Sequence, residues 1–147
     1  MKFLTQIEAV NWCKNNQILL DERDRPNLGK DYERFDIPSD AGQRIALVKG
    51  HLERYRNEEE LLIWIRDWGV WESAERPHIF YKFRLSYGEY RTLEKAPAQL
   101  CSRDEFEDSL SIVTLAVLFL WDCFIVSKAN GKNLFYSHDE YGMITSE

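Results

Sequence analysis

The sequence has little of several features on which whole classes of protein depend. Its three cysteines, Cys13, Cys101 and Cys123, never occur in Cys-x-x-Cys spacing. We therefore expect neither a disulfide framework nor a cysteine zinc site, and a reducing cytoplasm fits this cysteine usage best. Only seven glycines and four prolines occur among the 147 residues, which excludes collagen-like and low-complexity chains.

Positive charge and long apolar runs are also scarce. The chain carries 19 basic and 25 acidic side chains, for a formal net charge of −6. Nucleic acid is not an expected partner, because non-specific binding relies on clustered cations that neutralise phosphates. The most apolar stretch, 110–126, contains Ser111, Thr114 and Asp122 and is shorter than the roughly 20 apolar residues of a membrane span. Polar residues follow Leu4 at once, so no secretory signal and no membrane contact are predicted.

Common catalytic and cofactor motifs are missing as well. The sequence has no Gly-x-Gly-x-x-Gly, no phosphate-binding loop, no Gly-x-Ser-x-Gly and no His-Glu-x-x-His. Because each of these motifs supplies the backbone or side chains of a known chemistry, an enzyme is not favoured and no cofactor is predicted. Aromatic residues, in contrast, are plentiful at 14%, with five tryptophans among them.

The helix and strand patterns predict one globular domain over residues 1–147. Thr5, Ser39 or Asp40, and Ser102 are suitable caps for helices over 6–15, 41–56 and 103–120. Continuous apolar runs at 61–65 and 121–127 predict two central strands, and 17–20 is a short strand candidate. Asn130-Gly131 is a hairpin signal that returns 133–138 antiparallel to 121–127. Residues 21–36 and 93–101 are expected to be loops.

Residues 77–87 fit two patterns, because their aromatic and aliphatic residues match both strand alternation and a helical stripe. Pro77 suits the first turn of a helix and Gly88 suits the position after its end, so we predict a helix. The expected fold is α/β, in the sense of mixed α+β. It would have a small three- to four-stranded mixed sheet, helices on both faces and a C-terminal β-hairpin.

The first candidate site is the run from Ser137 to Tyr141. His138 stands beside Asp139 and Glu140, and an imidazole near carboxylates can bind a divalent metal or act as a general base. Adjacent residues of a strand point to opposite faces, so the three side chains can converge only if the chain turns there. A plain turn at the sheet edge is the competing interpretation, and no metal is predicted.

The second candidate lies at the end of the strand at 61–65. It comprises Trp64, Trp68, Trp71, Glu72, Glu75 and His78, around the strand end, where open sheets with flanking helices tend to bind ligands. Trp68 and Trp71 would present flat faces to a ligand or partner. The competing interpretation is that they cap the hydrophobic core.

A third candidate is a mixed-charge tract with Arg84, Tyr87 and Arg91. Two arginines seven residues apart could clamp an anion. The competing interpretation of this tract, which also contains Glu89 and Glu94, is a solvated face of ion pairs.

Several short segments of residues 61–142 also occur together in one known family. They are Trp68-Gly69-Val70-Trp71 with Ser73 and Glu75, Arg84 with Ser86-Tyr87-Gly88-Glu89, Glu94 with Ala96-Pro97, Asp104-Glu105-Phe106-Glu107-Asp108, and Trp121-Asp122 followed by Ser137-His138-Asp139-Glu140. With this set the chain resembles a family of small bacterial proteins, of planctomycete type, that has no assigned activity. The resemblance implies a shared fold and no particular reaction. Family members often carry Gly-His after the Ala-Pro pair, where this chain has Ala98-Gln99.

The favoured function is therefore a non-enzymatic protein-binding module in the bacterial cytoplasm, similar to an immunity or inhibitor protein. The partner would be held by Trp68, Trp71 and Tyr87, because aromatic residues dominate the energetics of interfaces. A basic partner is favoured, because the negative charge of this chain speeds encounter with a basic protein. An exposed aromatic patch would also favour a homodimer. The alternatives are a small metal-dependent hydrolase that uses His138, Asp139 and Glu140, and a sensor that binds an anionic small molecule.

Overall fold

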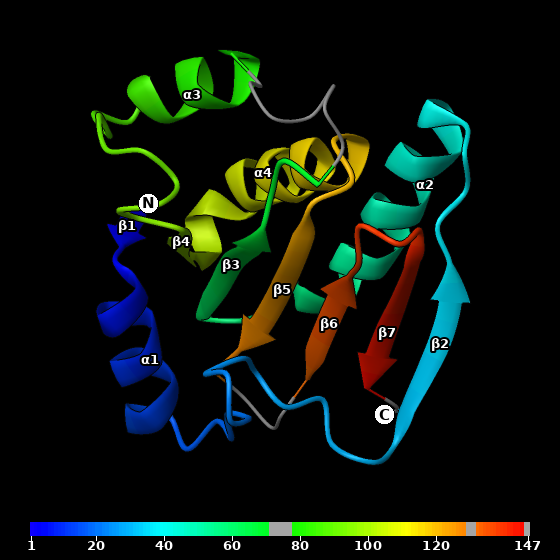
Figure 1. The fold of residues 1–147 in the computed structure, drawn as a ribbon, viewed down its shortest axis with the longest axis horizontal. Coiled ribbons are helices and arrows are strands. Elements are labelled where there is room, and N and C mark those ends of the chain that lie inside the picture. The colour runs from blue at the N-terminus through cyan, green and yellow to red at the C-terminus, as the bar shows by residue number, and fades with distance from the viewer. Residues whose placement is uncertain (71–77, 129–131, 146–147) are drawn as a thin grey trace.

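The computed structural model describes residues 1–70, 78–128 and 132–145. Within these ranges the chain forms a mixed α+β fold, with four α-helices and one antiparallel sheet of seven strands (Figure 1). The helices are α1 (Gln6–Asn15), α2 (Ala41–Leu52), α3 (His78–Leu85) and α4 (Phe106–Leu118). The strands are β1 (Lys2–Leu4), β2 (Tyr32–Asp36), β3 (Glu60–Asp67), β4 (Ala98–Ser102), β5 (Asp122–Ser127), β6 (Asn133–Tyr136) and β7 (Tyr141–Thr145). Their order across the sheet is β1-β4-β3-β5-β6-β7-β2.

The predicted three- to four-stranded mixed sheet is wrong, because the sheet is larger and antiparallel. The sequence patterns missed β1, β2, β4 and β7. Strand β2 has mostly exposed residues and pairs with β7, more than a hundred positions along the chain, with Phe35 opposite Gly142. Such a strand is stabilised by its remote partner rather than by a local apolar pattern. The strand predicted at 17–20 is reduced to a single bridge between Leu20 and Pro26.

The central elements and the hairpin are as predicted. Strands β3 and β5 are neighbours in the middle of the sheet, with Leu61 opposite Ser127. Strand β6 runs antiparallel to β5, while the Asn130-Gly131 turn lies outside the described residues. The helix predicted over 77–87 is confirmed as α3, and Gly88 follows it with a φ of +79°, a left-handed conformation that suits glycine.

Side-chain caps start the helices where the sequence predicts them. The Thr5 hydroxyl accepts a hydrogen bond from the backbone N–H of Glu8 at 3.2 Å, and the Glu8 carboxylate accepts one from the N–H of Thr5 at 2.7 Å. Asp40 accepts the N–H of Gln43 at 2.8 Å at the start of α2. These contacts satisfy N–H groups that have no partner within the helix itself.

The two faces of the sheet are covered differently. On one face, which we call the helix-covered face, α2 and α4 pack Val48, Leu52 and Ile112 against strand residues such as Ile63 and Ile125. Figure 1 shows these two helices behind the sheet. On the opposite face, which we call the groove face, cover comes from α1 and from the segment 16–31, which contributes Ile18, Leu20 and Leu28. Helices therefore lie on both faces, as predicted.

Candidate functional site

A groove of about 490 Å³ opens on the groove face, over β5, β6 and β7. Because alternate residues of a strand point to the same side, its floor consists of Phe124, Phe135, Tyr141 and Met143. The Phe124 and Phe135 rings are stacked with centroids 4.4 Å apart, and the Tyr141 ring meets Phe135 edge-on at 6.3 Å. The segment 25–29 and Tyr32 form a wall. The groove thus has a largely aromatic floor, in which Phe124 and Phe135 are only 5% and 7% exposed and Tyr141 is half-buried.

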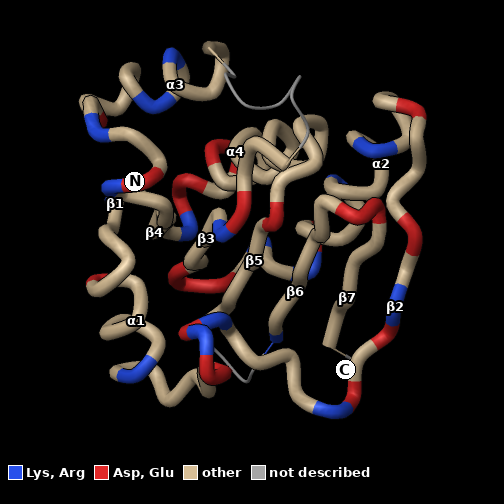
Figure 2. Tube along the Cα trace, in the orientation of Figure 1, with Lys and Arg blue, Asp and Glu red and all other residues tan. Residues whose placement is uncertain are grey.

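Polar groups from several strand ends gather at one end of this groove. In an antiparallel sheet, β5 begins beside the end of β6, so Asp122 at the start of β5 meets the residues that follow β6. Ser137, His138 and Asp139 line the groove next to Asp122. Figure 2 shows acidic positions at the end of β3, at the start of β5 and in the turn after β6. We call this region the carboxylate end of the groove.

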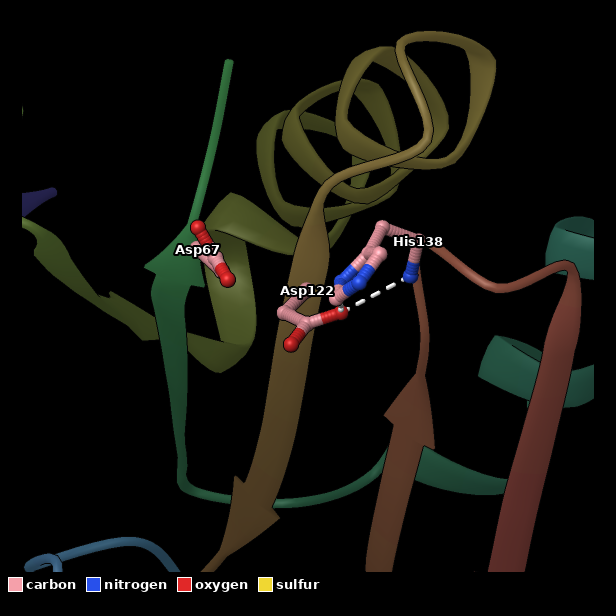
Figure 3. A group of neighbouring side chains, drawn as sticks. All are labelled: Asp67, Asp122 and His138. Carbon is pink, nitrogen blue, oxygen red and sulfur yellow. Dashed lines mark hydrogen bonds and ion pairs between the residues drawn. The ribbon is translucent and has the colours of Figure 1, made fainter. Parts of the chain in front are cut away.

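His138 is held in place by Asp122. One oxygen of that carboxylate, Oδ1, accepts hydrogen bonds from the backbone N–H of His138 and from its ring Nδ1, both at 2.7 Å (Figure 3). The other ring nitrogen, Nε2, lies 3.5 Å from Oδ1 of Asp139. The chain turns at this point, because the N–H of Ser137 donates to the carbonyl of Tyr141 at 2.8 Å. The imidazole therefore lies between two carboxylates, in a fixed orientation.

These neighbours change the acidity of His138. Burial by itself lowers the pKa of the imidazole, but the hydrogen bond and charge of Asp122, followed by the charges of Asp139 and Asp67, raise that pKa above its ordinary value. A nearby anion favours the protonated ring, which is why the net shift is upward. The ring consequently keeps its proton to a higher pH than an unperturbed histidine would.

Asp67 adds a third ligating side chain beside this pair. It ends β3 directly opposite Asp122 of β5. One ligand atom from each of Asp67, Asp122 and His138 lies within 4.8 Å of the others, and Figure 3 shows the three side chains at the ends of neighbouring strands. Two carboxylates and an imidazole are ligands that suit divalent transition metals. Asp67 is not among the residues that line the groove.

Sequence reasoning did not select Asp67 or Asp122 as site residues. Each is an acidic residue at one end of an apolar strand, and that signal was present in the sequence. Their proximity, however, requires β3 and β5 to be antiparallel neighbours. The pairing between strands far apart in the sequence is what a single sequence does not reveal.

Glu140 does not join its two neighbours at the carboxylate end. Its Oε1 lies 3.2 Å from Nη2 of Arg44 on α2, and Arg44 also donates from Nε to the carbonyl of Pro38 at 2.5 Å. Of the predicted run, the structure brings His138, Asp139 and Tyr141 to the groove and turns Glu140 towards the helix-covered face.

The tryptophan candidates are distributed differently from what the sequence suggested. Trp68 is partly buried and packs against the core of the helix-covered face, whereas Trp71 and Glu75 lie outside the described residues. His78 is exposed at the start of α3. The strand-end rule that suggested this site applies to parallel sheets with helical crossovers, and the neighbours of β3 are antiparallel.

The arginine candidates do not form an open clamp. Arg84 is only 1% exposed, donates to the carbonyl of Ala96 at 2.8 Å and lies over the ring of Phe3. Burial lowers the pKa of its guanidinium to about 10. Arg91 binds Glu89, with nitrogen–oxygen distances of 2.7 and 2.9 Å. The Arg91–Glu89 pair agrees with the ion-pair interpretation, whereas Arg84 is buried and belongs to no solvated face.

Tyr87, the remaining candidate, forms a hydrogen bond with a residue of α4. Its hydroxyl donates to the Asp108 carboxylate, and its ring lies 5.2 Å from that of Phe83. At 38% exposure it contributes to the surface near α3 and α4, on the side of the sheet opposite the groove.

No protein-family model matches the chain, and it matches no curated protein sequence and no solved structure. The resemblance to the planctomycete-type family therefore stays a prediction. Among the helices of the described ranges, none has the length and apolarity needed to cross a membrane.

Proposed function

We propose that this chain is a non-enzymatic binding module that holds a protein partner in the groove over β5, β6 and β7. The observation that carries the proposal is the groove itself, which joins an aromatic floor to a carboxylate end. Binding sites commonly combine a largely apolar surface with a few polar groups that orient the ligand. Aromatic residues such as Tyr141 also contribute strongly to protein interfaces.

The state of the thiols argues against a reaction that uses a cysteine nucleophile. Cys13, Cys101 and Cys123 are all buried. Burial raises the pKa of Cys13 and Cys101 to about 12, and it raises the pKa of Cys123 as well. The thiolate is the nucleophilic form of cysteine, so these three side chains are packing residues at neutral pH.

The test is capture of a partner by the full chain from a lysate of its native cells, followed by titration of the purified pair. The groove variant combines Asp139→Ala with Tyr141→Ala. Its matched control combines Asp104→Ala with Tyr90→Ala, because both of these residues are exposed elsewhere on the surface.

We expect the groove variant to bind the captured partner at least tenfold more weakly than the wild type, and the control to bind it normally. Circular dichroism would verify that both variants are folded. Equal binding by the groove variant, or no specific partner at all, would overturn the proposal.

A second candidate function, divalent metal binding, is favoured by one specific observation. Asp67, Asp122 and His138 offer ligand atoms within 4.8 Å of one another. Such a site would retain His138 from the predicted metal-dependent hydrolase and replace Asp139 and Glu140 by two different carboxylates.

Calorimetric titration with Zn²⁺, Mn²⁺ and Mg²⁺ would test this second candidate. Asp67→Asn should abolish stoichiometric binding of the preferred ion, and Asp104→Asn should leave it unchanged. Because Asp67 does not line the groove, the same Asp67→Asn variant should still bind the protein partner. No saturable heat with any of the three ions would exclude the metal function.

A further inference from the structure

The chemistry of the groove also indicates what kind of group enters it, an inference that rests on the binding function proposed above. We infer that the partner presents an arginine. Its aliphatic stem lies along the groove floor beside Tyr141 and Met143, and its guanidinium donates to Oδ2 of Asp122 and of Asp139, next to the imidazole of His138. Three properties of the lining support this assignment.

The first property is charge. Of the charged residues that line the groove, Asp21 and Arg25 neutralise each other, since Nε and Nη2 of the arginine both lie 2.8 Å from Oδ2 of the aspartate. At the carboxylate end, Asp122 and Asp139 flank the single imidazole of His138. Even with a protonated ring, the charged side chains that line this end within the described residues leave one negative charge unbalanced. This end of the groove attracts a cation and repels an anion.

The second property is the supply of hydrogen-bond acceptors. Oδ1 of Asp122 already accepts both hydrogen bonds from His138, and Oδ1 of Asp139 is the oxygen nearest to the ring. Within the described ranges, Oδ2 of each aspartate accepts no hydrogen bond. A guanidinium is planar and carries five N–H donors, so it can bridge two such oxygens at once. An ammonium is a compact point charge without this planar fork.

The third property is the aromatic floor. Phe124 and Phe135 are stacked but only 5% and 7% exposed, so the accessible apolar part of the floor is the half-buried pair Tyr141 and Met143. Long cationic side chains cover apolar surface with their methylene stems. The ring of Tyr141 already contacts one guanidinium, because Arg34 of β2, which does not line the groove, lies 4.0 Å from the ring centroid. Aromatic faces attract cations, and arginine stacks on them especially well.

The size of the groove fits a side chain with part of its backbone. At about 490 Å³ it lies within the range of sites that enclose small ligands. We therefore expect a short segment of the partner, with the arginine as its anchor, to occupy it.

The inference can be tested on the whole protein by NMR titration with Ac-Gly-Arg-Gly-NH2 at low ionic strength, in the presence of EDTA to exclude metal effects. The matched ligand is the same peptide with citrulline, which has nearly the shape of arginine but no charge. We expect the arginine peptide to cause saturable shifts at Asp122, Phe135 and His138. The citrulline peptide should bind more weakly by about tenfold or by a larger factor, because hydrogen bonds to charged groups are stronger than those between neutral groups.

Variants separate the groove from the rest of the surface. Asp139→Asn changes an exposed residue and should lower the affinity for the arginine peptide about tenfold. The control Asp104→Asn should have no effect, and Asp67→Asn should change affinity by less than Asp139→Asn, because Asp67 is outside the lining. Equal binding of the arginine and citrulline peptides, or no saturable shifts at the groove, would overturn the inference.

The outcome also distinguishes this inference from the proposed function. If the arginine peptide fails but the Asp139→Ala, Tyr141→Ala variant still loses the captured protein partner, the guanidinium assignment is wrong and the binding module stands. If both experiments fail, both ideas are wrong.

Discussion

The two faces of the sheet use the same strands for different purposes. On the helix-covered face, α2 and α4 enclose residues such as Ile112 and Ile125 completely. On the groove face, α1 and the segment 16–31 leave Tyr141 and Met143 half-buried beside the groove. An antiparallel sheet tolerates this asymmetry, because one face is sufficient for a core and the other can meet solvent. Both faces have a buried core, but the larger one lies on the helix-covered face, and the proposed binding site lies on the other.

Two histidines illustrate the difference. His51 of α2 lies against the Phe35 ring at 4.4 Å and contacts the Tyr136 hydroxyl from Nδ1 at 3.0 Å. Burial, with a smaller effect of Arg54, lowers the pKa of His51. At His138 the neighbouring carboxylates outweigh burial and raise the pKa. The same side chain thus serves as packing on one face and as part of a charged cluster on the other.

The largest expected difference between the faces is in stability. Ile112→Ala removes a fully buried side chain from the helix-covered face and should lower the free energy of unfolding by about 2–5 kcal/mol. Met143→Ala, on the half-open groove face, should cost only about 1 kcal/mol. Urea denaturation of both variants measures the two losses. Similar losses would show that the two faces contribute equally to the free energy of unfolding, and the proposed difference between them would be wrong.

Gly142 lies in β7, and its substitution tests the packing of the last three strands of the sheet, β6, β7 and β2. Strands β6 and β7 also contribute residues to the groove floor. A Cβ at this position would run into the Phe35 ring and lie 2.7 Å from the carbonyl oxygen of Phe135. Gly142→Ala should therefore lower the free energy of unfolding by about 1–3 kcal/mol, with faster amide exchange in β2 and β7. Gly50→Ala is the control, since that Cβ meets nothing within 4 Å. This helical substitution should stabilise by about 0.5–1 kcal/mol, and a loss of stability there would contradict the packing argument.

Glu140 tests whether the residues of the 138–140 turn share one function. Its carboxylate is 51% exposed and pairs with Arg44, so Glu140→Gln should lower the free energy of unfolding by only about 0.5 kcal/mol. Binding of the arginine peptide should stay within about twofold of the wild type. A large loss of binding with unchanged stability would place Glu140 in the recognition site after all.

The smallest effects are expected from pH. Because the folded pKa of His51 is lowered, its contribution to stability is complete above the ordinary histidine pKa of about 6.5 and is lost as the pH falls towards the lowered value. The contribution of His138 is complete below its ordinary pKa and is lost as the pH rises through the raised folded value.

NMR titration of the imidazole carbon-bound protons measures both pKa values directly. His51→Gln and His138→Gln assign the signals. We expect His138 to titrate at higher pH than His51. The reverse order would show that the carboxylate end does not hold the charge that the binding proposal requires.

Local features of the fold were predictable from particular residues. Thr5, Asp40 and Ser102 identified helix starts, and Gly88 decided between helix and strand for α3. Each of these signals acts within a few positions of the chain, through one side chain and the nearest backbone groups. The apolar runs of β3 and β5 similarly identified the two central strands.

The candidate site was predictable only in part. His138 and Asp139 were recognised because they are adjacent in the sequence, but Glu140 was grouped with them for the same reason and in fact pairs with Arg44. Asp122 was missed, since its contact with His138 spans 16 positions and two strands. Adjacency in the sequence is a poor guide where a turn sends neighbouring side chains to opposite faces.

The sequence by itself determined the composition of the molecule: an acidic, aromatic-rich chain with capped helices and two strongly apolar strands. Only the tertiary structure decided the seven-stranded order and the groove on one face of the sheet. It also decided the meeting of Asp67, Asp122 and His138. The reason is physical: caps and apolar periodicity depend on neighbours a few residues away, whereas edge strands and site residues depend on partners that only the pairing of distant strands brings close.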